Sequence, residues 1–267
     1  MKVELFWKTI QFLKYYFRAK WPNKISDPEI LNLLKDFLNL NQRKTIYNEI
    51  ENLRVSAGQD NSKIDFYELG ARRQFKGSKR IKDILSKSVS PKQKCELLQN
   101  ISKKAGEGII VEIGTSLGFV SAYLAIGNSE KSVFTFEGNP TIVDFANRMH
   151  KNLNINNVHI VNGDFEDTLD KNLSKINLIS FAFIDGNHQE NATIRYFEKI
   201  LKKCNEDSII VLDDIYWSKG MNQAWNNIKK YREVSASIDL FQIGIVFLKS
   251  SLHGNFTVIK SRIDPFF

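Results

Sequence analysis

The chain has 267 residues, of which 42% are hydrophobic and 25% are charged, and it carries a net charge of +8 with a pI near 9.3. These values are ordinary for a globular protein and are sufficient to bury a full core without disulfide bonds. No run of about 18 apolar residues occurs, so no transmembrane helix is predicted.

The N-terminal part, residues 1–82, is predicted to be a helical extension that ends in a basic loop. Residues 1–21 are aromatic and basic, and Phe6, Ile10, Leu13 and Phe17 follow helical spacing. This amphipathic helix is expected either to pack on its own domain or on a second copy in a homodimer, or to lie on a membrane surface. It has no signal-peptide core.

Two further helices are predicted in the extension, over residues 27–40 and 42–54. Asp27 is expected to cap the first of them, with Pro28 at its first position. Residues 57–82 are polar and basic and are predicted to form a loop, of which residues 70–80 are the most charged part.

The second part, residues 83–267, alternates between helical and strand patterns after a helix at 91–104. Apolar runs predict strands at 109–113, 132–137, 158–162, 178–185 and 208–213, with helices at 118–126, 141–153, 190–204 and 219–231. Such alternation predicts a parallel sheet covered by helices on both faces. Residues 238–248 and 256–260 are predicted to close the sheet as an antiparallel hairpin.

The cysteines and the basic charge limit where the protein acts and what it binds. Cys95 and Cys204 lie far apart in helical patterns, without partners at metal-ligand spacing, and predict reduced, inert thiols in a cytoplasmic protein. The positive charge permits an acidic partner, such as nucleic acid or anionic lipid, but does not require one, because many of the lysines fall on helix faces expected to be solvated.

A strand, a glycine turn and a helix follow one another at residues 109–126. The turn contains Gly114, Thr115, Ser116 and Gly118, and Glu112 lies near the end of the strand. This unit places a nucleotide-like ligand at a helix N-terminus. The dinucleotide pattern G-x-G-x-x-G is absent, because Ser116 stands where the second glycine would be.

The stretch resembles motif I of the class I S-adenosylmethionine (SAM) dependent methyltransferases, an acidic residue followed by x-Gly-x-x-x-Gly. The resemblance implies a Rossmann-like, seven-stranded, mostly parallel sheet with one antiparallel strand. It also implies SAM as cofactor, with Glu112, Gly114, Thr115, Ser116 and Gly118 in its binding site.

Carboxylates follow the next two strands. Glu137 and Gly138 come roughly twenty residues after the glycine turn, where a carboxylate can accept hydrogen bonds from ribose hydroxyls. Asp164 and Phe165 follow the third strand, and Asp164 is expected to meet an adenine amino group. The resemblance assigns Glu137 and Asp164 these roles, and Asp185 is a further cofactor-binding candidate.

Three more carboxylates, of Asp185, Asp213 and Asp214, lie at the ends of the fourth and fifth strands. Gathered there they would repel one another unless a cation joined them, and oxygen ligands suit Mg²⁺ or Mn²⁺. The pattern resembles the catechol and caffeoyl-CoA type O-methyltransferases, whose metal is held by an Asp and an Asp-Asn pair. Here Asp214 takes the place of the Asn, which puts the metal in doubt.

His188 stands three residues after Asp185, where the catechol-type enzymes carry a lysine that acts as general base. Histidine can accept a hydroxyl proton near neutral pH. Three roles stay open for it: base, metal ligand, or a helix-start residue without chemistry. His188 and Asp185 are the predicted catalytic residues.

The sequence from about residue 60 to 250 is similar to a bacterial group of uncharacterised class I methyltransferases. Trp217 and Met221 are expected either to line an acceptor pocket or to cover the sheet. The predicted function is SAM-dependent O-methylation of a small molecule, with or without a divalent cation. Ribose methylation of RNA is one alternative. A SAM-binding protein without turnover, docked at the inner membrane surface by its N-terminal helix, is the other.

Overall fold

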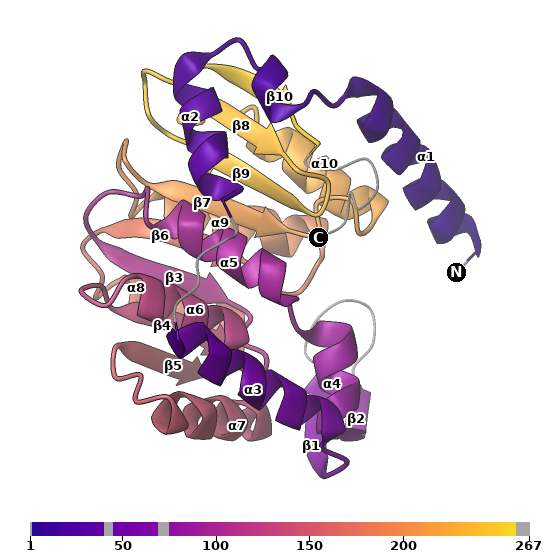
Figure 1. The fold of residues 1–267 in the computed structure, drawn as a ribbon, viewed down its shortest axis with the longest axis vertical. Coiled ribbons are helices and arrows are strands. Elements are labelled where there is room, and N and C mark those ends of the chain that lie inside the picture. Colours follow the sequence, from indigo (N-terminus) through magenta and orange to yellow (C-terminus); the bar gives the residue numbers. More distant parts are fainter. Residues whose placement is uncertain (1, 40–44, 69–74, 260–267) are drawn as a thin grey trace.

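The structure, a computed structural model, describes residues 2–39, 45–68 and 75–259. Its central element is an eight-stranded sheet in the order β10-β8-β9-β7-β6-β3-β4-β5, and a separate two-stranded sheet pairs β1 with β2 (Figure 1). The strands of the larger sheet are β3 (Ile109–Ile113), β4 (Val133–Glu137), β5 (Val158–Asn162), β6 (Ile179–Ile184), β7 (Ile209–Asp213), β8 (Ala236–Asp239), β9 (Ile243–Phe247) and β10 (Gly254–Thr257).

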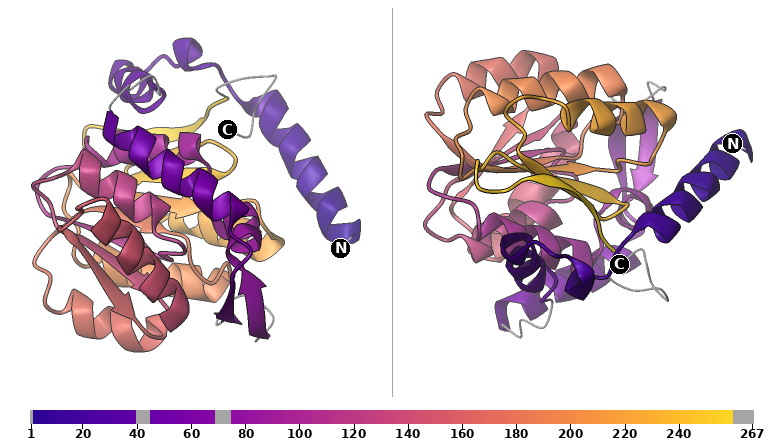
Figure 2. Two further views of the ribbon diagram at one scale, coloured as in Figure 1. Left: turned by 60° about the horizontal axis from the view of Figure 1, so that its bottom comes forward. Right: turned by 90° about the horizontal axis from the view of Figure 1, so that it is seen from above.

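Helices cover both faces of the sheet (Figure 2). One face carries α2 (Pro28–Phe37), α3 (Thr45–Gln59), α5 (Lys92–Ser102), α6 (Phe119–Gly127) and α7 (Pro140–Asn152). The other carries α8 (Phe165–Leu173), α9 (Glu190–Leu201) and α10 (Lys219–Ile228). The predicted architecture, a mostly parallel sheet with helices on both faces, is therefore confirmed.

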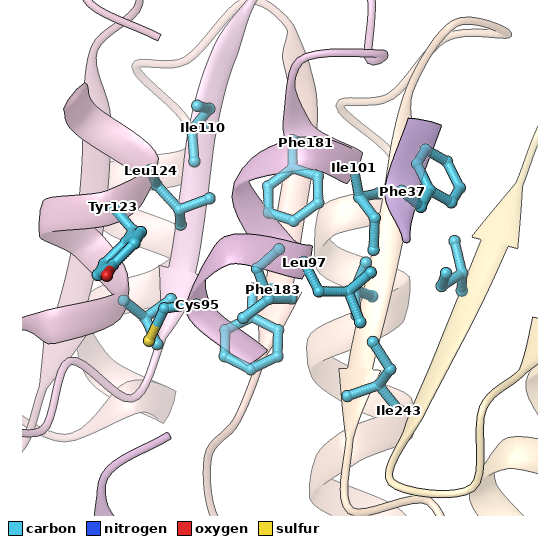
Figure 3. Packing of buried hydrophobic residues seen from close by; sticks show 14 of the residues in the cluster. Phe37, Cys95, Leu97, Ile101, Ile110, Tyr123, Leu124, Phe181, Phe183 and Ile243 are labelled. Atoms are coloured by element: carbon cyan, nitrogen blue, oxygen red, sulfur yellow. The ribbon is translucent and has the colours of Figure 1, made fainter. Parts of the chain in front are cut away.

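The buried strand β6 shows how the sheet separates its two cores. All six of its residues are buried, because side chains alternate across a sheet that is covered on both faces. Phe181 and Phe183 belong to the core on the α5 side, whereas Ala182 and Ile184 belong to the core on the α9 side. Figure 3 shows Leu97 of α5 close to Phe183 within the first core. The position of α5 on β6 is thus set by apolar packing.

The C-terminal strands differ from the prediction in register and direction. The segment 238–248 is not one strand, because a tight turn with Phe241 at φ 69° divides it into β8 and β9. The antiparallel hairpin is formed by β8 and β9, and β9 pairs antiparallel with β7. The expected partner segment supplies β10, which pairs parallel with β8 and makes an eighth strand.

The N-terminal extension contains more regular structure than its sequence predicts. Asp27 caps α2 as expected, accepting the Ile30 N–H at 2.9 Å. The prediction of a loop over residues 57–82 is wrong, because β1 (Lys63–Glu68) and β2 (Phe75–Arg80) pair antiparallel and lead into α4 (Ile81–Ser88). Strand β1 does carry an alternating apolar signal in Ile64 and Phe66, but the surrounding charges and glycines mask it in the sequence pattern. Residues 69–74 of the basic segment lie outside the described residues.

The predicted N-terminal helix is present as α1 (Lys2–Arg18), but it packs through a different face. Phe6 and Phe17 of the expected apolar stripe are 68% and 83% exposed. The packed face carries Tyr15, whose ring lies 5.2 Å from that of Phe241 and whose hydroxyl donates to the Val258 carbonyl. No helix in the described ranges is long and apolar enough to cross a membrane.

Truncation of the packed face is expected to release α1. Tyr15→Ala should raise amide hydrogen exchange in α1 by about 100-fold or more, because removing a buried aromatic side chain costs about 3–5 kcal/mol. The matched control Phe17→Ala removes an exposed ring of the same helix and should leave exchange within a few-fold of wild type. Equal exchange in the two variants would contradict this packing.

Candidate functional site

The predicted site residues gather at the carboxyl ends of β3, β4, β6 and β7, the edge where ligands bind in open α/β sheets. Helix α1 and the β1–β2 hairpin both lie on this side of the sheet (Figure 1). The Lys8 ammonium lies 3.6 Å from the centre of a Trp217 ring, and Asn139 Nδ2 donates to the Asp65 carbonyl at 3.4 Å. The extension therefore borders the site.

The glycine turn is required by close backbone approach at this edge. Gly114 has φ 100°, and a Cβ there would lie 2.3 Å from the Asp185 carbonyl oxygen. Gly118, at φ 85°, caps α6, and its Cβ would lie 3.0 Å from His150 Nε2. Ser116 between them also has a positive φ, of 47°. These positions bring the ends of β3 and β6 together, which a side chain at Gly114 would prevent.

Glu137 is fixed directly beside this turn. Its carboxylate accepts the backbone N–H groups of Ser116 and Asn139, each at 3.0 Å. Burial raises the pKa of Glu137, while the N–H donors of Asn139, Ser116 and Gly138 lower it. The sequence-predicted pair Glu137 and Gly138 thus meets the glycine turn at the end of β4.

Two of the predicted cofactor residues lie inside the sheet layer. Thr115 is buried, and its hydroxyl lies 2.6 Å from that of Thr135. Glu112 is fully buried, with Oε2 accepting from Thr135 and Oε1 without a partner among the described residues. Burial raises the pKa of Glu112 to about 8. Both side chains therefore support the turn from beneath.

Asp164 and Phe165 lie at the start of α8. Asp164 is exposed and caps the helix, accepting the Glu166 N–H at 2.8 Å. Phe165 packs edge-on against Tyr196, with ring centroids 5.9 Å apart. A Cβ at Gly186 would lie 2.7 Å from the Phe165 ring, so this ring lies against the end of β6.

His188 lies between two carboxylates. Its Nε2 is 3.6 Å from Asp185 Oδ1, and its Nδ1 is 4.0 Å from Asp214 Oδ2. The backbone here is strained, because Asn187, His188 and Asp214 have φ values of 66°, 40° and 50°. Such left-handed residues cluster at functional sites, where the surrounding fold holds them. The imidazole is half-buried, and each of its ring nitrogens faces a carboxyl oxygen.

The sequence-based prediction missed a functional residue in this cluster, Lys94. Its ammonium forms an ion pair with Asp213 Oδ2, and the two side chains are only 7% and 4% exposed. Burial lowers the pKa of Lys94, but the carboxylates of Asp213, Asp185 and Asp214 raise it by a larger amount. The pKa of Lys94 therefore lies above its usual range. Lys94 enters from α5, on the core face of the helix that also carries Leu97.

The carboxylates of the cluster also perturb one another. Burial, and next the neighbouring Asp213 carboxylate, raise the pKa of Asp185 well above its ordinary value. Asp213 Oδ1 has no hydrogen-bond partner among the described residues. The Lys94 ammonium therefore offsets only part of the repulsion that the three acids create.

The cluster does not fit the predicted divalent cation. Within residues 2–39, 45–68 and 75–259, no group of three or more His, Cys, Asp or Glu side chains converges as metal ligands do. A divalent cation about 4 Å from the Lys94 ammonium would meet a repulsion of about 8 kcal/mol at an effective dielectric constant near 20. Asp185, Asp213 and Asp214 are therefore brought together as predicted, but around an ammonium group.

Trp217 and Met221 are separated by the structure. Trp217 is half-exposed at the mouth of the site, with its ring 6.2 Å from that of His188. Met221 is buried, and its sulfur accepts a hydrogen bond from Thr193 at 3.3 Å. Trp217 can therefore contact an acceptor, whereas Met221 covers the sheet.

Comparison with known proteins finds a family match over the middle of the chain. Residues 111–215 match a family described as a methyltransferase domain. No curated protein sequence matches the chain. The match runs from β3 through the start of the loop after β7, and so includes the glycine turn, Glu137 and the carboxylate cluster.

Solved structures with the same fold include three methyltransferases. An O-methyltransferase from Bacillus cereus in complex with S-adenosylhomocysteine (SAH) is 21% identical, with 78% of this chain and 93% of that chain covered and a TM-score of 0.56. The O-methyltransferase TomG from Streptomyces achromogenes, in complex with SAM, is 17% identical, with 60% of this chain and 82% of that chain covered and a TM-score of 0.52. The SAH-bound methyltransferase PaMTH1 from Podospora anserina is 13% identical, with 84% of this chain and 97% of that chain covered and a TM-score of 0.56.

The family match and the fold agree on one class of protein. Residues 111–215 match a methyltransferase domain, and the sheet and the glycine turn after β3 share the fold of solved SAM- and SAH-bound methyltransferases. The resemblance first drawn from Glu112 to Gly118 is therefore confirmed at the level of the class.

The buried Glu112 carboxyl predicts a pH-dependent stability in the ligand-free protein. Its pKa rises from 4.5 to about 8 on folding. The resulting stabilisation is fully present below pH 4.5 and is lost as the pH rises through about 8. Glu112→Gln keeps the shape but cannot ionise, so its unfolding free energy should fall less than that of wild type, by roughly 2–5 kcal/mol, between about pH 5 and pH 9.

Urea unfolding of the two proteins at several pH values measures this difference. Parallel stability curves for wild type and Glu112→Gln would show that Glu112 does not hold its proton in the folded state.

Proposed function

We propose that the protein transfers the methyl group of SAM to a hydroxyl oxygen of a small molecule. The observation that carries the proposal is His188, held between the Asp185 and Asp214 carboxylates at the edge of the sheet where this class binds its cofactor. Support comes from the Bacillus cereus enzyme and TomG, which share the fold and are O-methyltransferases.

The residues around the glycine turn fit SAM. Glu137 presents a carboxylate next to the turn, and the backbone of Gly114 to Gly118 is open to close approach by a ligand. These residues would hold the ribose and the amino acid part of the cofactor, with Asp164 and Phe165 near the base. When bound, SAM supplies a methyl group on a positively charged sulfur, which an oxygen nucleophile can attack in line.

His188 is proposed to take the proton of the acceptor hydroxyl. An imidazole can accept a proton near neutral pH, and the carboxyl groups of Asp185 and Asp214 lie 3.6 Å and 4.0 Å from its two ring nitrogens and orient the ring. Trp217 lies beside the imidazole and can shield the reacting oxygen from water. No step is assigned to a divalent cation, because the cluster already holds the Lys94 ammonium.

Removal of the Glu137 carboxylate is expected to weaken SAM binding. Glu137→Ala should raise the Kd for SAM by about 5- to 150-fold, which corresponds to about 1–3 kcal/mol for hydrogen bonds to a charged acceptor. Isothermal titration calorimetry measures the change. Glu130→Ala, at the opposite end of β4, removes an exposed carboxylate and is the matched control. Unchanged affinity in Glu137→Ala would contradict this placement of the cofactor.

Loss of the proposed base is expected to slow methyl transfer without loss of cofactor. His188→Gln should reduce transfer by about 10²- to 10⁴-fold, with the Kd for SAM unchanged. SAH release over a panel of phenols, catechols and sugars measures the rate, and His253→Gln, an exposed histidine, is the control. Undiminished transfer in His188→Gln would rule out the base. Tight SAM binding without transfer to any acceptor would favour a binding protein without turnover.

A further inference from the structure

We propose that the Lys94 ammonium replaces the divalent cation as the charge that holds Asp185, Asp213 and Asp214 together, so that this site works without a metal. The catalytic meaning of this assignment rests on the proposed function. The assignment of the cation itself rests on the geometry of the cluster.

The first step is that this edge of the sheet requires a cation. Asp185 directly follows β6, and Asp213 is the last residue of the neighbouring strand β7. Asp214 comes next in the chain. Parallel strands place their carboxyl ends at one edge, so the topology forces three acids into one region. Asp213 is almost fully buried there, and a buried carboxylate needs a positive partner.

The second step is that the protein supplies this cation from its own core. Lys94 is 6% exposed and bonds Asp213 Oδ2 directly. Its ammonium lies 5.9 Å from the centre of the Phe183 ring on β6. The ammonium therefore has the Phe183 ring on one side and the carboxylates on the other. Lys94 is a buried part of this site and is not a surface lysine that folds back onto it.

The third step is that the ammonium is held in place by packing. Helix α5 lies on β6 through Leu97 and Ile101, both fully buried against a core that contains Phe181 and Phe183 (Figure 3). Lys94 lies one helical turn before Leu97 on the same face. Displacement of the ammonium by a metal ion would leave the Lys94 charge buried without a partner, which disfavours the exchange.

Lys94 is therefore a positioning residue. It fixes Asp213, and through the shared cluster it sets the arrangement of Asp185 and Asp214, the two carboxylates that flank His188. The fixed +1 charge of Lys94 offsets the negative charge of the three carboxylates, as a bound ion does in a metal-assisted site. This charge compensation does not require a free cation.

Direct titration with Mn²⁺, followed by the electron paramagnetic resonance signal of the free ion, tests the proposal in the full-length protein. Wild type should show no Mn²⁺ site that depends on Asp213. Lys94→Ala opens space among the carboxylates and should gain an Mn²⁺ site at least tenfold tighter than any residual binding by wild type, and Lys94→Ala combined with Asp213→Asn should lose this gain. Lys92→Ala, an exposed lysine two residues earlier on α5, should behave as wild type.

The wild-type titration decides the question if Lys94→Ala does not fold. Tight Mn²⁺ binding by wild type that disappears in Asp213→Asn would overturn the proposal, as would a folded Lys94→Ala that gains no affinity. A merely structural lysine would change stability but would not create a metal site. Failure of SAM to bind the same wild-type preparation would remove the proposed function and leave the cation assignment standing.

Discussion

The ion pair between Lys94 and Asp213 is the interaction on which the rest of the site depends. A parallel sheet delivers acidic strand ends to one edge, and burial makes their repulsion costly. Removal of one member of a buried pair leaves an uncompensated charge, at a cost of about 3–5 kcal/mol. The ammonium therefore permits Asp185 and Asp214 to lie on either side of His188, which is the arrangement that the proposed O-methylation uses.

The charge arrangement of the site depends on its backbone conformation. Gly114 allows the end of β6 to approach the turn after β3, and that approach positions Asp185. His188 and Asp214 then adopt left-handed conformations, which are uncommon for residues other than glycine. Strain of this kind persists because the sheet and its two cores fix both strand ends. The stability of the fold thus offsets the conformational cost of the site's backbone geometry.

The sequence predicted the sheet, the turn and the acidic strand ends because each has a local pattern: an apolar run, a glycine spacing, or a carboxylate after a strand. The prediction failed where the pattern was absent or ambiguous. The apolar residues of β1, Ile64 and Phe66, lie in a segment that is charged and glycine-rich as a whole, which obscured the strand. Helix α1 has aromatic residues on more than one face, so spacing could not select the packed one. Lys94 had a signal that went unused, a lysine in the apolar series with Leu97, Leu98 and Ile101.

A crystal structure of the protein with SAH, grown with Mn²⁺ and measured at the manganese absorption edge, tests the central claim most directly. The account predicts density for the Lys94 side chain within hydrogen-bond distance of Asp213 and no anomalous peak among Asp185, Asp213 and Asp214. An anomalous peak coordinated by these carboxylates, with Lys94 turned away, would contradict it.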